Sequence, residues 1–456
     1  MKHTRLYILL LASTLLTACT SDIHTDGAGG YSHIKLAIGP SQLGGSLQTR
    51  ATWSDASATD GEMMHQACVV VADAQGKVVA IKHIAAANGE SERETVDLGA
   101  MPNGTYTFYN FGNITPSAQD DANPASVTIS GLTFKVGEAV PNGINATTTT
   151  AQFDHYTLGT AGIPMTNIET HEVNSDVTIT LELYRMLSKV RFYVSNLTQS
   201  DVHISHITMG EITTDGTPIY LFPQKDEQGQ PTISWPDAAQ RTAADFTYYD
   251  NSADPFALSY GQTSIAMPDQ YLNESQTAHI TGRFPLTVTM QRRVNGTWTD
   301  DVAHALITLA NIPRNTMVTV PLQLTDYVLS MEAFFYPPIG GYPAYSMEKR
   351  NDEYYATFHG AGNFMLQPHF YRFADAERPE NWISLNDPSM VEDYSLRVND
   401  PQHIFTTAPH IDTTTGEILG TLSGTTGRAY AQLTLLIRLN DTQTLTYNRT
   451  IFFIAQ

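Results

Sequence analysis

Residues 177–196 (VTITLELYRMLSKVRFYVSN) carry an alternation of apolar side chains that changes parity midway. The apolar side chains occupy odd positions as far as Leu183 and even positions from Val190 onward, so a period of two holds on both sides. A single straight strand of this length would reach roughly 66 Å, several times the usual length. We therefore predict two strands, or one bulged strand, with a bend between Arg185 and Lys189 that swaps the buried face. Two ordinary sandwich strands joined by a short corner would give the same pattern.

The length of 456 residues predicts about two to four domains, each with a proper core, so folding requires no disulfide. Frequent Tyr, Thr and turn residues, and the scarcity of long 3.6-residue periods, indicate an all-β protein. The formal charge of −21 opposes contact with phosphate backbones, so we expect no nucleic acid partner. A polar, turn-prone stretch predicts a domain boundary near Leu197 to Asp201. In chain order we expect a signal peptide (1–18), a tether with the first strand (19–50), and three β units (51–199, 200–326 and 327–456).

The first residues read as the secretion signal of a lipoprotein. Lys2 and Arg5 precede a short apolar core, and the segment ends in Leu-Thr-Ala-Cys at Cys19. This ending resembles the lipobox at which bacteria attach diacylglycerol to the cysteine and cleave before it. We predict lipidation of Cys19, a firm hold on the outer membrane through the acyl chains, palmitate among them, and a cell-surface location. The residues 20–22 that follow are similar to an acidic surface-export tag.

A short amphipathic strand and a lone arginine follow the lipid site. Ile34, Leu36 and Ile38 alternate with polar or small residues, which predicts a strand with one buried face. Arg50 stands in a turn-rich stretch that predicts an exposed loop. An arginine-specific protease cutting between Arg50 and Ala51 would release this strand together with the lipid. A solvated loop arginine is the alternative interpretation.

Nothing in the sequence indicates catalysis or metal binding. HExxH, GxSxG, Walker-type GxxxxGK and CxxC motifs do not occur. His203 and His206 would point to opposite faces of a strand, an arrangement unsuited to a shared metal ion. Cys68 lies in a strand-like run without a disulfide partner and is expected to be a buried, inert thiol. We therefore expect no enzyme, no metal site and no cofactor.

The last of the three units is rich in aromatic residues. Exposed Tyr and Trp rings can hold the C–H faces of sugars, whereas most aromatic rings in a β-sandwich belong to the core or to a domain interface. The candidate glycan contacts are Tyr342, Tyr345, Tyr354, Tyr355 and Trp382.

Several short motifs, in this order along the chain, resemble those of Bacteroidales fimbrillins, the lipoprotein-precursor subunits of the type V pilus. They are a Gly-x-Tyr-x-Phe strand at 104–108, Ile-Pro-Met at 163–165, the arginine-containing link into Ser-Lys-Val at 188–190, and the Arg-Asn turn at 314–315 before a last strand. The resemblance covers roughly residues 16–325. It implies two tandem β-sandwich domains of immunoglobulin or transthyretin type. A third, C-terminal β domain has no counterpart in two-domain stalk subunits.

The resemblance also implies a mechanism. Such subunits lose their first strand to an arginine protease, and a strand from the next subunit fills the exposed groove by donor-strand exchange. We therefore predict a fimbrial subunit, a tip or accessory adhesin rather than a stalk unit because of the third domain. Its expected partners are other fimbrial subunits and a host or bacterial glycan or protein. The alternatives are a lipid-retained anchor and a glycan-binding surface lipoprotein outside any pilus. Residues 448–456 could supply a donor strand unless they complete the third domain.

Overall fold

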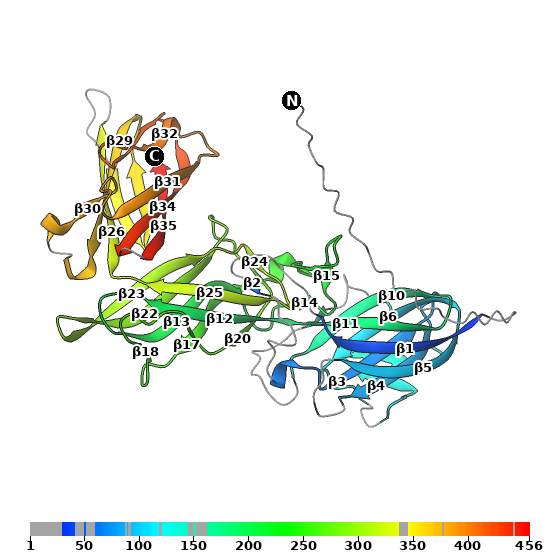
Figure 1. Ribbon diagram of the computed structural model, residues 1–456. Helices are drawn as coiled ribbons and strands as arrows, with labels where there is room; N and C mark the ends of the chain where they lie inside the picture. Colours follow the sequence, from blue (N-terminus) through cyan, green and yellow to red (C-terminus); the bar gives the residue numbers. More distant parts are fainter. Residues whose placement is uncertain are drawn as a thin grey trace, which may run out of the picture.

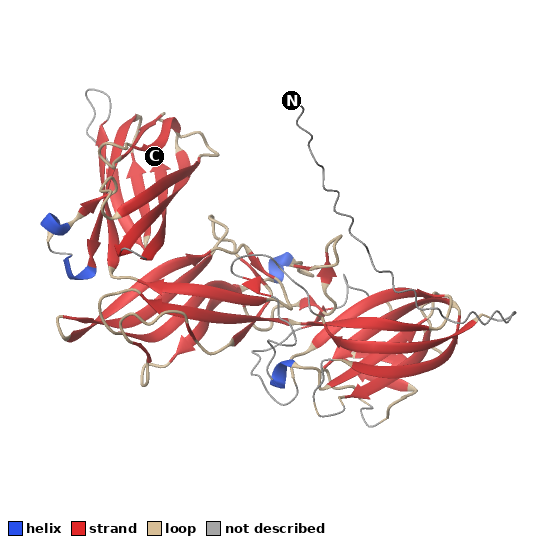
Figure 2. Ribbon diagram, viewed as in Figure 1, coloured by secondary structure: helices blue, strands red, loops and turns tan. Residues whose placement is uncertain are grey.

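The computed structural model describes residues 30–41, 50–51, 60–86, 89, 93–117, 121–144, 150–151, 162–336, 345–375, 378–440 and 443–456. Regular structure in these residues consists of β-strands and short 3₁₀ helices without an α-helix (Figure 2), which confirms the all-β class. In the same residues, no helix has the length and apolar character that crossing a membrane requires. The predicted signal segment, the lipidation site Cys19 and the candidate glycan contact Tyr342 lie outside the described residues.

The first unit is a single curved sheet of seven strands. Apolar side chains from all seven strands share one core, so the sheet closes around it like the two layers of a sandwich (Figure 1). Cys68 lies on the other face, where burial raises the pKa of its thiol to about 12, as expected of an inert cysteine. The strands hydrogen-bond in the order β4 (Val78–Ala85), β3 (Gln66–Ala72), β6 (Gly104–Gly112), β10 (Met165–Val173), β11 (Val177–Arg185), β1 (Tyr31–Pro40) and β5 (Glu94–Pro102).

The second unit is a sandwich of two sheets that share one hydrophobic core. One sheet contains β19 (Ile265–Ala266), β12 (Leu187–Asn196), β25 (Met317–Leu324) and β2 (Arg50–Ala51), with β20 (Gln270–Asn273) also paired to β12. The facing sheet contains β17 (Ala243–Asp250), β13 (Val202–Thr213), β22 (Phe284–Val294) and β23 (Thr297–Ile307), with β18 (Phe256–Leu258) also paired to β13.

The parity change in residues 177–196 marks the passage from one core to the other. β11 ends at Arg185 in the first sheet, Met186 is buried at the crossing, and β12 begins at Leu187 in the second unit. The break lies within the predicted bend. The chain therefore passes from the sheet of the first unit to a sheet of the second at Met186, because β12 pairs with strands of the second unit. This passage lies ahead of the boundary predicted near Leu197 to Asp201. The odd positions of β11 face the first core, although Val177 at its start is exposed.

The third unit is again a two-sheet sandwich, and its core is rich in aromatic residues. Its C-terminal strand β35 (Gln443–Ala455) is paired on both sides, in parallel with β28 (Glu353–Phe358) and antiparallel with β34 (Gly427–Asn440), so it completes this unit. One sheet contains β26 (Tyr327–Tyr336), β29 (Gly362–Arg372), β33 (Ile418–Leu422) and β32 (Phe405–Ile411), with β30 (Ile383–Ser384) also paired to β29. The other contains β27 (Tyr345–Arg350), β28 (Glu353–Phe358), β35 (Gln443–Ala455), β34 (Gly427–Asn440) and β31 (Val391–Asn399).

The first two units are joined by more than the crossing strand. A segment of the second unit reaches over the outer face of the first, where β14 (Ile219–Tyr220) pairs with β9 (Thr150–Ala151). Phe222 follows and packs its ring against Tyr109 and Phe111 of β6. The outer face of the first sheet is therefore covered partly by this segment of the second unit and partly by the hairpin of β7 (Ser126–Ile129) and β8 (Leu132–Lys135) of the first unit. The shared cluster stabilises the two units together.

Candidate functional site

The first strand, β1, occupies an interior position of the first sheet. It runs parallel to β11, with Ile34 opposite Val177 and Ile38 opposite Leu181, and antiparallel to β5 on its other side (Figure 1). Ile34, Leu36 and Ile38 are fully buried, as their alternation predicted. Parallel pairing of β1 with β11 is not visible in the sequence, because the alternation shows the buried face of a strand and not its neighbours.

Removal of β1 would leave a groove between β5 and β11. Within the described residues β5 pairs only with β1, so the loss of this strand separates β5 from the rest of the ladder. Three buried aliphatic side chains contribute about 5 to 9 kcal/mol in total, at about 1.5 to 3 kcal/mol each. The groove is therefore an apolar channel whose walls carry unpaired main-chain groups, the arrangement that binds an added strand.

The polar contacts of β1 lie at its two ends. At the start, the His33 amide donates to Asp176 Oδ1 over 2.7 Å, and the Ser32 hydroxyl donates to Asn103 Oδ1 over 2.6 Å. Near the end, Arg93 donates to the Ala37 carbonyl over 3.3 Å. These contacts fix the register of β1, whereas its apolar side chains supply most of the burial.

The end of β1 reaches the junction of the first two units. Ser41 is buried, and its carbonyl accepts from Asn315 Nδ2 over 3.4 Å. Asn315 also accepts from the Arg185 amide over 3.2 Å and has a φ of 56°, in the left-handed region where asparagine is enriched. The neighbouring Arg314 is buried and pairs with Glu274 over 2.8 Å. The Arg-Asn turn thus holds the end of β1 and the β11–β12 crossing in one place.

The backbone of Arg50 and Ala51 forms the two-residue strand β2 at the edge of the second unit, where it pairs with Val318 and Met317 of β25. This corrects the expectation of a loop at Arg50. The free edge of β25 supplies ladder partners that the turn-rich sequence did not reveal. β1 and the predicted cleavage site therefore belong to different sheets, connected by residues 42–49, which lie outside the described part of the chain.

The structure does not bring the candidate glycan contacts together. Tyr354 is 1% exposed in the core of the third unit, which removes it from the set. Tyr355 stacks on Phe452 at 4.8 Å between ring centroids, and Tyr345 is exposed on β27 of the same sheet. Trp382 stacks on Tyr371 against the opposite sheet, at 5.0 Å. Core packing, the alternative raised by the sequence, describes Tyr354, and packing against other rings describes Tyr355 and Trp382, whereas Tyr345 is exposed.

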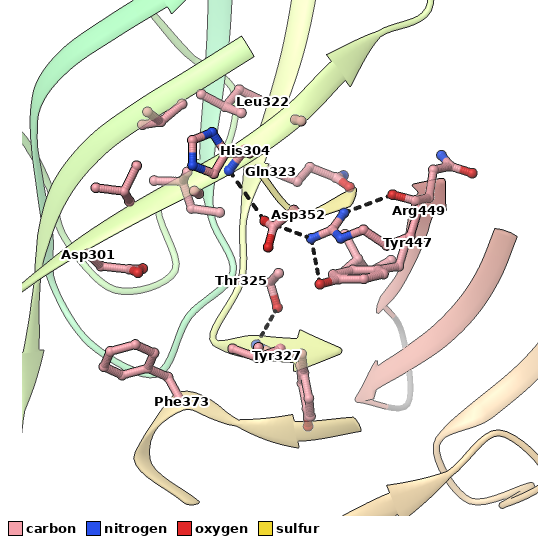
Figure 3. Close-up of a pocket in the computed structure, with 18 of the residues that line it drawn as sticks. Asp301, His304, Leu322, Gln323, Thr325, Tyr327, Asp352, Phe373, Tyr447 and Arg449 are labelled. Carbon is pink, nitrogen blue, oxygen red and sulfur yellow. Dashed lines mark hydrogen bonds and ion pairs between the residues drawn. The ribbon is translucent and has the colours of Figure 1, made fainter. Parts of the chain in front are cut away.

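A cleft of about 540 Å³ separates the second and third units (Figure 3). The Asp352 carboxylate lies in it, 2.7 Å from Lys349 Nζ and 3.3 Å from Arg449 Nη2, and accepts from the backbone amide of His304 of the second unit. Burial of Asp352 opposes ionisation, but the charges of Arg449 and Lys349 outweigh it and hold its pKa below the ordinary value. Burial lowers the pKa of His304. The cluster is a set of paired charges within the third unit, and the hydrogen bond from the His304 amide connects it to the second unit. It has no sequence motif because Arg449 and His304 lie on strands far from Asp352 in the sequence.

An ion pair between the second and third units gives their contact a pH dependence. His279 Nε2 lies 3.2 Å from Glu353 Oε1, and this hydrogen bond raises the pKa of His279 above its ordinary 6.5. Because the pKa of His279 is raised in the folded state, the pair contributes its full stabilisation of the fold below about pH 6.5. This contribution is lost as the pH rises through the raised pKa. We expect His279→Gln to destabilise the contact at about pH 6 and to have little effect at about pH 8.5. Urea unfolding of both proteins at the two pH values measures this, and a pH-independent difference would contradict it.

Comparison with known proteins adds a family match and a set of similar folds. A family model described as fimbrillin-A associated anchor proteins Mfa1 and Mfa2 matches residues 42–301, more than half of the chain. A candidate cell adhesion protein from Bacteroides eggerthii is 13% identical with a TM-score of 0.38, covering 65% of this chain and 87% of its own. A second candidate cell adhesion protein, from Parabacteroides distasonis, is 12% identical with a TM-score of 0.39, and the match covers 64% of this chain and 88% of that protein. The tip fimbrial protein Mfa3 from Porphyromonas gingivalis, truncated at its C-terminus, is 8% identical with a TM-score of 0.36, covering 68% and 96%. No protein with a curated description matched.

Proposed function

Because this chain belongs to the family of fimbrillin-A associated anchor proteins Mfa1 and Mfa2, we propose that it is a cell-surface subunit of a fimbrium, of the tip or accessory adhesin kind. The observation that carries the proposal is the interior position of β1, a strand with three fully buried aliphatic side chains that is encoded ahead of the arginine where we expect the cut. A lipid on Cys19 would hold the precursor on the outer membrane until that cut.

Assembly would proceed by exchange of strands. Cutting between Arg50 and Ala51 removes the covalent link to β1, and a strand from another subunit takes its place between β5 and β11. Re-covering three aliphatic positions recovers about 5 to 9 kcal/mol, which offsets much of the cost of association and ordering, and the main-chain ladder bonds to β5 and β11 add to it.

The paired state of β35 supports a terminal position in the fibre. This strand has partners on both sides, so its donation to another subunit would open the core of the third unit. The chain therefore suits a place where it receives a strand and does not donate its C-terminal one. A lipid-retained anchor that keeps β1 would offer neither a groove nor this strand. The family's description as anchor proteins supports this alternative, and the N-terminus of the mature chain distinguishes the two.

The N-terminus of the protein recovered from its native cell surface tests the proposal. Mass spectrometry of the mature chain is expected to find Ala51 as the first residue. A chain that begins at a lipidated Cys19 would exclude polymerisation through this groove and favour a lipid-retained anchor or a stand-alone lipoprotein.

Substitution of Arg50 tests the cleavage separately. We expect Arg50→Ala, and equally Arg50→Lys, to abolish the cut at this bond, because an arginine-specific protease requires the guanidinium group. The uncut chain should then remain with the detergent-extracted lipoprotein and be absent from sheared fimbriae on immunoblots. Arg378→Ala is the matched control, since Arg378 is 63% exposed in the third unit. Normal processing of Arg50→Ala would contradict the assignment.

A further inference from the structure

We infer that the groove left by β1 selects a basic partner strand, with lysine, arginine or histidine at the two outward positions that His33 and Lys35 occupy, followed by small residues. This inference rests on the proposed function, in that it describes the strand which replaces β1. The occupant is an extended terminal segment of another fimbrial subunit.

The outward face of β1 is basic along its first half. His33 and Lys35 point away from the core and are exposed, while the buried Ile34 and Leu36 alternate with them. The segment 31–40 (YSHIKLAIGP) contains no acidic residue. Its departure therefore removes only cationic groups from this part of the sheet.

The strands beside the groove present acidic groups to these positions. His33 Nε2 lies 3.3 Å from Asp97 Oδ2 of β5, and its amide donates to the Asp176 carboxylate ahead of β11. Lys35 is the register partner of the same Asp97. With β1 gone, Asp97 loses the cations of this strand and Asp176 loses an amide donor, so the carboxylates left at this end of the groove favour an incoming positive charge.

Arg93, a cation beside the groove, is already in an ion pair. Arg93 Nη2 pairs with Glu182 of β11 over 3.0 Å, so it does not neutralise the end of the groove at which His33 lies. The whole chain carries a formal charge of −21, which adds a long-range attraction for a cationic segment. The charge pattern thus favours the same partner at both short and long range.

The second half of the groove sets a size limit. The outward residues there are Ala37, which is half-buried beneath Arg93, and Gly39, which is buried. Pro40 and Ser41 are also buried, where the strand enters the junction with the second unit. A large outward side chain at the position of Gly39 would require this junction to open. The partner strand therefore carries its basic residues at one end and its small residues at the other.

Peptide competition with the cut chain tests the inference. The protein is the full chain cut after Arg50. Synthetic peptides are added to it and compete for the groove with the chain's own segment from ahead of the cut. The reference peptide has the sequence of residues 31–40. A second carries His33→Glu and Lys35→Glu, a third carries Gly39→Leu, and a fourth carries serine at the three aliphatic positions.

We expect the charge-reversed peptide to bind about 3- to 10-fold more weakly than the reference at low salt, since the pairs are exposed, and the difference to vanish at about 1 M salt. The Gly39→Leu peptide should bind at least as poorly. In the cut chain, Asp97→Lys should reverse the preference between the first two peptides. Equal binding of these two, together with no binding of the serine peptide, would overturn the charge inference and leave strand exchange intact. Failure of the reference peptide itself to bind would count against the proposed function.

Discussion

A chain with Leu36→Ala should lose about 2–5 kcal/mol of the free energy of unfolding of its first unit. Leu36 is fully buried on β1 and packs in the same core as Phe108 and Leu181. The substitution removes apolar contact and leaves a cavity that the neighbouring strands fill only in part, because β1 has a ladder partner on each side. Urea unfolding monitored by hydrogen exchange of β6 peptides reports on this unit separately from the other two.

The same substitution should have no effect after cleavage and strand exchange. Once β1 has left the sheet, Leu36 is no longer part of the fold, so the variant and the natural sequence should unfold at the same urea concentration. Lys35→Ala is the matched control on the outward face, with an expected change within about 0.5 kcal/mol in the uncut chain. A loss that persists after exchange would mean that β1 remains in the groove, contrary to the proposed function.

The second large effect is expected at Glu62, in the 3₁₀ helix Asp60–Glu62. Its carboxylate lies 3.0 Å from Lys189 Nζ and accepts from the Tyr271 hydroxyl, and its carbonyl accepts from Arg185 Nε over 3.0 Å. Both members of the Glu62–Lys189 pair are fully buried between the first two units. Glu62→Ala leaves the Lys189 ammonium with Asp269, 3.0 Å away, as its remaining acidic partner, and should cost about 3–5 kcal/mol.

An exposed pair of the same chemistry provides the control. Lys135 and Glu138 form an ion pair with side chains 58% and 60% exposed, so Glu138→Ala should change stability by less than about 1 kcal/mol. Glu62→Gln keeps hydrogen-bonding atoms without the charge, so its loss of stability should lie between those of Glu62→Ala and Glu138→Ala. Thermal unfolding of the three proteins at neutral pH gives the order. Equal losses for Glu62→Ala and Glu138→Ala would contradict a structural role for the buried pair.

Local pattern was sufficient for some features of this protein. The alternation of Ile34, Leu36 and Ile38 predicted an amphipathic strand, and the strand has this burial. The parity change in residues 177–196 predicted a break between Arg185 and Lys189, and Met186 lies there. In each case, the signal is the period of two that any half-buried strand requires.

Other features of the site had no local signal. Arg50 was expected in a loop, but β2 forms because β25 has a free edge. Tyr354 was a candidate surface ring, but β35 and β27 flank its strand and its side chain faces the core. The cleft residues His304, Asp352 and Arg449 lie far apart in the sequence: Asp352 and Arg449 meet because β28 pairs with β35, and His304 joins them because the second unit packs against the third.

The sequence by itself determined the all-β class, the alternating faces of the strands and the apolar character of the first strand, because these depend on neighbouring residues along one strand. Only the tertiary structure decided which strands are neighbours, that β11 and β12 belong to different cores, and that the odd-numbered Lys189 is buried. The physical reason is that one alternation is compatible with many pairings, while the choice among them depends on surfaces supplied by distant segments. Lys189 illustrates this, since its burial is offset by Glu62 and Asp269 from elsewhere in the chain.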